Sequence, residues 1–111
     1  MRRYKTLEIN LAMDVLEAIL IETELEEDTH DIEVLEDHLY GSLELIALMP
    51  GYEAIEKKLA IDVLSRVLKY LEHYKEETGN LTIHNVLLES HVNGQMEWLM
   101  SFLNFEQVKE L

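Results

Sequence analysis

The chain has 111 residues, of which 48% are hydrophobic, and it contains four Gly, one Pro and no Cys. This length supports one hydrophobic core, and the lack of Cys excludes disulfides, a thiolate nucleophile and a Cys-based zinc site. The 23 acidic residues outnumber the nine basic ones, so the formal charge is −14. Such a charge disfavours direct binding to nucleic acid or to a membrane surface and favours partners that carry positive charge.

The acidic residues are concentrated in the first half of the chain. No Lys or Arg lies between Lys5 and Lys57, whereas this interval contains fifteen carboxylates. Nine of them belong to the sixteen residues 22–37. A random mixture of surface charges would not leave 51 consecutive positions without a cation. A surface that only keeps the protein soluble is the alternative interpretation of the same pattern.

The spacing of apolar residues predicts an all-α fold, a compact bundle of four to five helices in one domain that spans residues 1–111. The expected helices cover about 7–26, 30–49, 52–78, 82–93 and 95–109. The first helix has two apolar rows on nearly opposite sides. One row comprises Ile9, Ala12, Leu16, Ile19 and Leu20, and the other includes Leu11, Ile21 and Leu25. A helix with two apolar sides is either central in a bundle or half of a subunit contact.

The second helix is expected to begin after a capping residue, with Asp28, Thr29 and Asp31 as the candidates. Its apolar residues form a single core stripe, namely Ile32, Leu35, Leu39, Leu43 and Ile46. The opposite face carries Glu33, Glu36, Asp37, Tyr40 and Glu44. The segment 22–37 is therefore predicted to form a fixed corner of the bundle, with its acids directed at solvent.

Pro50 and Gly51 indicate a turn, and Gly79 is expected at the position that follows the third helix. Five of the nine basic residues lie on this helix, namely Lys57, Lys58, Arg66, Lys69 and Lys75. We therefore expect the third helix to neutralise part of the acidic half from within the bundle.

Thr82 is the expected N-cap of a fourth helix, and Asn93 followed by Gly94 is a turn signal. The last segment is expected to form a fifth helix, although a single kinked helix from Ile83 to the end is an open alternative. Apolar residues circle this segment and include the only Trp and both Phe. Such a segment needs burial nearly all round, within its own bundle or against a second copy.

The sequence contains no convincing site for chemistry. His84 and His91 are seven residues apart, about 10 Å along a helix, which is too far to ligate one ion. An enzyme normally needs one or two polar groups set in an apolar pocket, and the least unfavourable candidates are His38, Tyr40, His73 and His84. No phosphate-binding loop or nucleophile motif occurs. We therefore expect no enzymatic activity, no metal and no cofactor.

No stretch approaches the roughly 20 apolar residues that span a bilayer. The basic start of the chain resembles a secretory signal, but Glu8, Asp14 and Glu17 interrupt the apolar run that would have to follow. The expected location is therefore the cytoplasm.

The first functional hypothesis is a small acidic inhibitor of the phage or mobile-element type, comparable in kind to anti-CRISPR or anti-restriction proteins and acting as a DNA mimic. It would present its acidic surface to a protein with a basic surface, such as a nucleic-acid-handling enzyme. The candidate binding surface comprises Glu22, Glu24, Glu26, Glu27, Asp28, Glu33, Glu36, Asp37, Tyr40 and Glu44.

The second hypothesis is a helical adaptor, regulator or immunity-type protein that binds through an apolar helix-helix interface. The candidate residues for this interface, which would also serve a homodimer, are Ile21, Leu25, Trp98, Phe102 and Phe105. In this case the acids are only a solvated surface. The two hypotheses are compatible, because a dimer formed by the aromatic segment would display two acidic surfaces.

Overall fold

The computed structural model describes the backbone of residues 6–23 and 28–110 and the side chains of residues 6–21 and 28–102. In chain order the elements are α1 (Thr6–Thr23), β1 (Thr29–Asp31), α2 (Ile32–Leu48), α3 (Ala54–Thr78), β2 (Thr82–His84) and α4 (Asn85–Glu110). The predicted helical bundle is confirmed, with four packed helices. The small two-stranded ribbon was not predicted.

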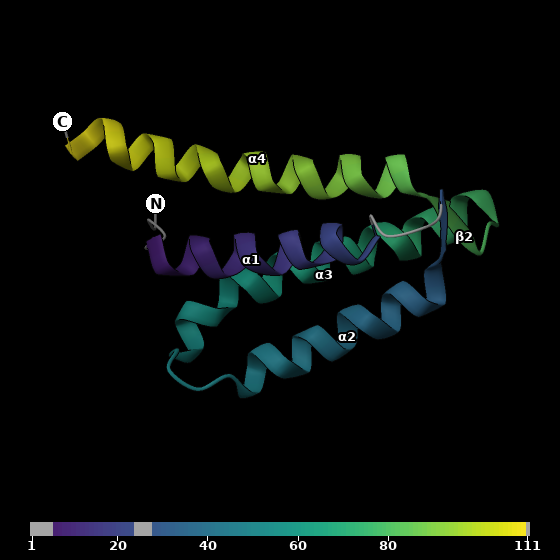
Figure 1. The fold of residues 1–111 in the computed structure, drawn as a ribbon, viewed down its shortest axis with the longest axis horizontal. Helices are drawn as coiled ribbons and strands as arrows, with labels where there is room; N and C mark the ends of the chain where they lie inside the picture. Colours follow the sequence, from purple (N-terminus) through teal and green to yellow (C-terminus); the bar gives the residue numbers. More distant parts are fainter. Residues whose placement is uncertain (1–5, 24–27, 111) are drawn as a thin grey trace.

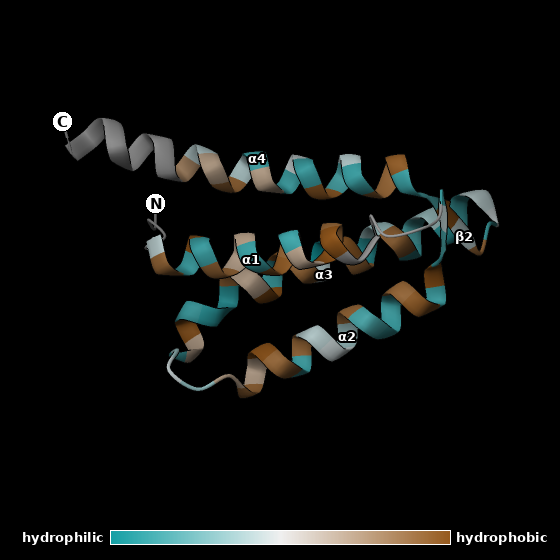
Figure 2. Cartoon of the chain, viewed as in Figure 1, coloured by the Kyte–Doolittle hydropathy of each residue, from teal (hydrophilic) through white to brown (hydrophobic). Residues whose placement is uncertain are grey.

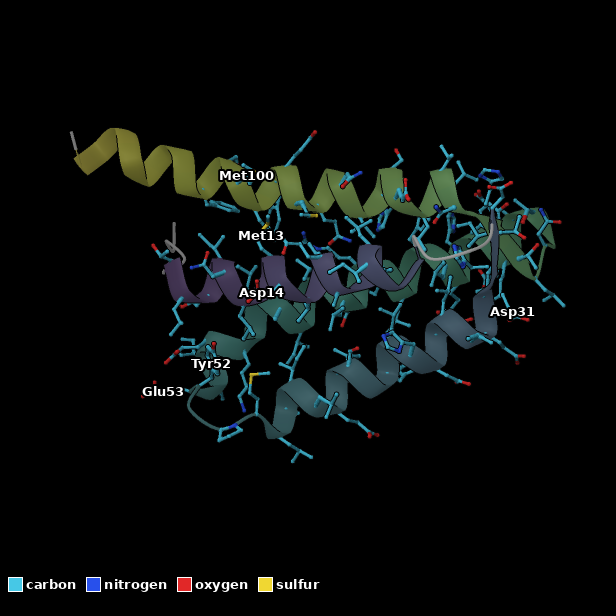
Figure 3. The ribbon with its side chains drawn as sticks, viewed as in Figure 1. Met13, Asp14, Asp31, Tyr52, Glu53 and Met100 are labelled. Atoms are coloured by element: carbon cyan, nitrogen blue, oxygen red, sulfur yellow. The ribbon has the colours of Figure 1, made fainter. Side chains whose placement is uncertain are left out.

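The helices pack in the order α4, α1, α3, α2 (Figure 1). Helix α1 contacts both α3 and α4, whereas α2 packs mainly against α3. The first apolar row predicted for α1 is confirmed, because its residues are buried or pack against the core. Of the second row, Leu11 is buried, Ile21 is exposed and Leu25 lies outside the described residues. Met13 lies between α1 and α4 (Figure 3). Because α2 lies at the edge of the bundle, its outer face is turned away from the other helices (Figure 1).

The core is formed by aliphatic side chains from all four helices. Its fully buried members include Ile9, Leu16, Ile32, Leu59, Leu64, Leu71, Leu88 and Leu99. The core stripe predicted for the second helix is confirmed, because Ile32, Leu39 and Ile46 are buried and the two residues between them pack against the core. Burial of such stripes is the main source of stability for helices of this length.

A short antiparallel ribbon ties the start of α2 to the start of α4. His30 on β1 pairs with Ile83 on β2, and the backbone hydrogen bonds extend beyond the strands from Ile32 N to Leu81 O and from Asn85 N to Asp28 O. A side-chain contact of 3.1 Å between His30 Nε2 and Asn85 Oδ1 adds to this connection. The predicted N-cap role of Thr82 is wrong, because this residue belongs to β2.

The segment from Asn85 to Glu110 forms one helix, not two. Asn93 and Gly94 lie inside α4, so the predicted turn at this point is wrong and the alternative of a single helix is the better one. Val92, Gln95 and Leu99 are buried on the side that faces the bundle. Burial on both sides of Gly94 keeps the helix continuous, because tertiary packing outweighs the weak local cost of a helical Gly.

The other helix boundaries follow local signals. Gly79 ends α3 in the left-handed conformation, at φ 72°, and its N–H donates to Lys75 O. This confirms the predicted stop, since a residue without Cβ adopts that conformation at little cost. Within the described part of the chain, no helix is long and apolar enough to cross a membrane.

Candidate protein-binding surface

The start of α2 is fixed by Asp31. Its carboxylate accepts hydrogen bonds from Glu33 N at 2.9 Å and from Val34 N at 3.3 Å, so it satisfies two of the amides that a helix start leaves without partners. One of the three predicted capping candidates is thereby confirmed. Figure 3 shows Asp31 at the end of α2 that adjoins the ribbon. Cap and ribbon together hold the acidic start of α2 in place.

Three acids of the predicted surface lie exposed along α2. They are Glu33, Asp37 and Glu44. Tyr40 is also exposed, and Asp28 is exposed at the ribbon. Among the residues that the structure describes, Asp37 and Glu44 form no ion pair. Their charges therefore remain available to a partner.

Glu36 differs from its neighbours because its charge is already paired. Lys75 on α3 donates to Glu36 Oε1 at 2.5 Å, and the two side chains are 28% and 17% exposed. The hydrogen bond to Glu36 is the main reason why the pKa of Lys75 is raised from its usual value of 10.5. This contact agrees with the expected neutralisation by the third helix, but it leaves Glu36 to hold α2 against α3.

Lys57 on α3 binds the other end of α2. Its ammonium donates a hydrogen bond to Ala47 O at 3.0 Å. The Lys57 residue as a whole is only 9% exposed. A cation at this place satisfies a terminal carbonyl and suits the negative end of the helix dipole. Lys57 and Lys75 thus bind Ala47 and Glu36 at the two ends of the contact between α2 and α3. Neither lysine pairs with Asp37 or Glu44.

The outer face of α2 is also apolar, which the sequence pattern did not predict. Val34, Leu45 and Leu48 are 66%, 70% and 81% exposed. Hydrophobic and hydrophilic residues accordingly alternate along α2 in Figure 2. An open groove of about 420 Å³ runs along this face, lined by Asp37, His38, Gly41, Ser42, Glu44, Leu45 and Leu48. We call this surface, from Glu33 to Leu48 on the outer side, the α2 face.

Six predicted residues of the two surfaces cannot be placed. Glu24, Leu25, Glu26 and Glu27 lie outside the described residues, as does the side chain of Glu22. The side chain of Phe105 is likewise outside the described part, although α4 extends past it. The acidic surface is therefore described only from Asp28 onward.

The other residues of the predicted apolar interface are divided between surface and core. Ile21 is exposed on α1, whereas Trp98 and Phe102 are half-buried on α4 and pack edge to face with ring centroids 5.0 Å apart. The guanidinium of Arg66 on α3 lies 4.3 Å from the centre of the Trp98 ring. Much of the aromatic segment is therefore used within the chain, where such contacts stabilise the packing of α4.

His91 and Tyr70 form a second contact between α3 and α4. Their rings stack with centroids 4.1 Å apart and an angle of 6°, and His91 Nε2 lies 3.1 Å from Gln95 Nε2. Burial lowers the pKa of His91 below its usual 6.5, despite an opposing hydrogen bond to the backbone of Arg66. Burial also raises the pKa of the Tyr70 phenol, with a smaller contribution from Tyr74. Both groups are therefore held neutral.

The four catalytic candidates are not assembled into one site. His38 and Tyr40 lie on α2, His73 pairs with Glu77 on α3 at 3.0 Å, and His84 accepts from Val86 N at 3.2 Å. In the described residues no group of three or more His, Asp or Glu side chains could hold a metal ion. The arrangement of these polar groups does not define a reaction.

Comparisons of the chain with protein-family models, with curated proteins and with solved structures gave no match.

Proposed function

We propose that this chain is a non-enzymatic binding protein that presents the acidic α2 face to a basic surface of another protein. The observation that carries the proposal is the pair Asp37 and Glu44, which are exposed on one helix and form no ion pair in the described structure. Such a surface speeds association with a basic partner and makes binding sensitive to salt.

An inhibitor of a nucleic-acid-handling protein is the function that this surface supports best. The carboxylates exposed on α2 offer a basic groove the same sign of charge as a phosphate backbone does. Along the helix axis, Asp37 lies about 6 Å from Glu33 and about 10.5 Å from Glu44. The cap at Asp31 and the ribbon support this proposal, because charges on a fixed helix lose little freedom on binding.

A helical adaptor or regulator that acts through apolar contacts is the second candidate. The specific observation in its favour is the exposure of Leu45 and Leu48 on the same α2 face. This location differs from the expected interface on α1 and α4, because Trp98 and Phe102 pack within the bundle.

The test is affinity capture from the host cell at low salt, followed by elution in a salt gradient. Asp37→Lys together with Glu44→Lys should abolish capture of the partner that the wild-type chain retains, and the retained partner should elute as salt rises. The matched control is Asp14→Lys with Glu76→Lys, which makes the same change of net charge at exposed positions on α1 and α3.

The control should still capture the partner, which should elute at a slightly lower salt concentration than it does from the wild type. Capture that survives both the α2 reversal and high salt would exclude the proposed acidic interface. Circular dichroism of all variants checks that each one remains folded.

A further inference from the structure

The exposed residues of α2 repeat with the spacing of a coiled-coil seam. Among the exposed residues of this helix, five recur at alternating intervals of four and three positions, namely Val34, His38, Gly41, Leu45 and Leu48. That interval keeps side chains on one line when two helices pack side by side. Three of the five are aliphatic and strongly exposed. The other stripe of α2 is buried against the bundle, so this helix has two separate packing faces.

Gly41 lies at the middle of this seam. It is helical and exposed, and a Cβ added there would meet nothing within 4 Å. A Gly within a helix destabilises it by roughly 0.5–1 kcal/mol relative to Ala, so the position is not explained by the folding of α2. A residue without a side chain lets a second helix approach the backbone closely, as small residues do at other helix interfaces.

Two acids of α2, Asp37 and Glu44, flank the seam on one side. If His38 and Leu45 are assigned to heptad position a, then Asp37 and Glu44 both fall at position g. Residues at that position lie beside the corresponding positions of a partner helix and select it by charge. Neither of these acids forms an ion pair with a Lys or Arg in the described structure.

We propose that the α2 face binds one amphipathic helix of a partner protein, with aliphatic residues along its centre and Lys or Arg along its edges. The proposal rests on the proposed function and specifies the partner's contacting element. The apolar seam supplies contact area, and Asp37 and Glu44 pair with the flanking cations. Helix α2 is 17 residues long, about 25 Å, which matches a partner helix of two to three heptads. A second copy of this chain is disfavoured because it would place acid against acid at a charge of −14.

The probe is a synthetic helical peptide of roughly three heptads, with Leu at positions a and d and Lys at e and g. One comparison peptide carries Glu in place of Lys, and another has the same composition in scrambled order. Titration of the full chain is followed by amide chemical shifts, which report both affinity and location. We expect the Lys peptide to shift amides of residues 34–48, and we expect the other two peptides to bind at least about tenfold more weakly.

The double variant Leu45→Gln, Leu48→Gln should bind the Lys peptide with an affinity at least about tenfold lower. The double variant Asp37→Lys, Glu44→Lys should lose affinity to a similar extent. The control Val86→Gln changes another exposed aliphatic residue, at the start of α4, and should leave affinity unchanged. All changed positions are exposed, so the variants remain folded, and thermal unfolding verifies this.

Equal binding of the ordered and scrambled peptides would overturn the proposal, as would shifts confined to another element. Shifts of α2 that depend on protein concentration without peptide would identify a second copy as the occupant and would also overturn it. If charge reversal weakens binding and the Leu variants do not, the acidic function stands and the helix-binding inference fails.

Discussion

Lys75 Nζ lies 2.5 Å from Glu36 Oε1, so the helix that carries the acidic surface is joined through one of its own acids to the helix that carries most of the cations. Glu36 had been predicted to belong to the partner-binding surface with Asp37. Adjacent positions on a helix point about 100° apart, and this rotation separates an acid that holds the bundle together from an acid that faces solvent. The ion pair is therefore structural, and the α2 face begins beside it.

The ion pair is expected to contribute to stability in a way that depends on salt and pH. A double-mutant cycle with Glu36→Gln and Lys75→Gln should give a favourable coupling energy in urea unfolding, and added salt should reduce it. Because the folded chain raises the pKa of Lys75 above 10.5, the coupling should be fully present below pH 10.5 and should disappear as pH rises through the folded value. A coupling energy of zero at low salt would show that the contact is not stabilising.

Asp31→Ala should lower the free energy of unfolding by about 1 kcal/mol, because the amides of Glu33 and Val34 lose their acceptor. Asp28→Ala is the matched control, because Asp28 is exposed and its backbone carbonyl, which the substitution retains, accepts a hydrogen bond from Asn85 N. The control should change stability much less. Equal effects of the two substitutions would mean that loss of an acidic charge, and not loss of the cap, is responsible. Thermal and urea unfolding provide the measurement.

Gly94→Ala should raise the free energy of unfolding by roughly 0.5–1 kcal/mol, since Gly94 is helical and an added Cβ meets nothing within 4 Å. Gly79→Ala should have the opposite effect, because Gly79 has a φ of 72° that a residue with Cβ rarely adopts. Destabilisation by both substitutions would indicate a turn at Asn93 and Gly94, as the local sequence had suggested. Urea unfolding of the two variants and the wild type decides between the two structures.

Protonation of His91 should oppose folding. Burial between α3 and α4 lowers the pKa of this imidazole below 6.5, so the unfolded chain binds the proton more tightly. The contribution of neutral His91 is therefore present above pH 6.5 and is lost as pH falls through the lower, folded value. His91→Phe keeps a ring beside Tyr70 but cannot be protonated. We expect the wild type to lose more stability than this variant on acidification, as measured by urea unfolding well above and well below pH 6.5.

The same loss in both proteins would contradict the expected role of His91. The comparison between variants is needed because acidification also neutralises carboxylates in a chain with a charge of −14, which relieves repulsion in the wild type and in the variant alike.

The periodicity of the sequence predicted the helices well where each has a single buried stripe. On α2, Ile32, Leu39 and Ile46 are buried as expected. Asp31 is one of the three residues predicted as caps, and Gly79 is the predicted stop. These signals are local, since they depend on side chains within one helical turn of each other.

The features that were missed depend on contacts between distant segments. Strands β1 and β2 have three residues each and pair across more than fifty positions, so neither has an alternating pattern of its own. The turn signal at Gly94 was outweighed by burial of Val92 and Gln95 on either side of it. Exposure of Leu45 and Leu48 could not be predicted either, because it depends on α2 lying at the edge of the bundle.

The central claim is that the charge of the α2 face drives association with a basic protein, and the association rate constant tests it most directly. This constant is measured for the captured partner at low and at high ionic strength, with the wild type, the Asp37→Lys and Glu44→Lys variant, and the Asp14→Lys and Glu76→Lys control. The account predicts a fast rate that falls steeply with salt for the wild type and the control, and a slow rate with little salt dependence for the α2 variant. Equal rates and equal salt dependence in all three proteins would contradict it.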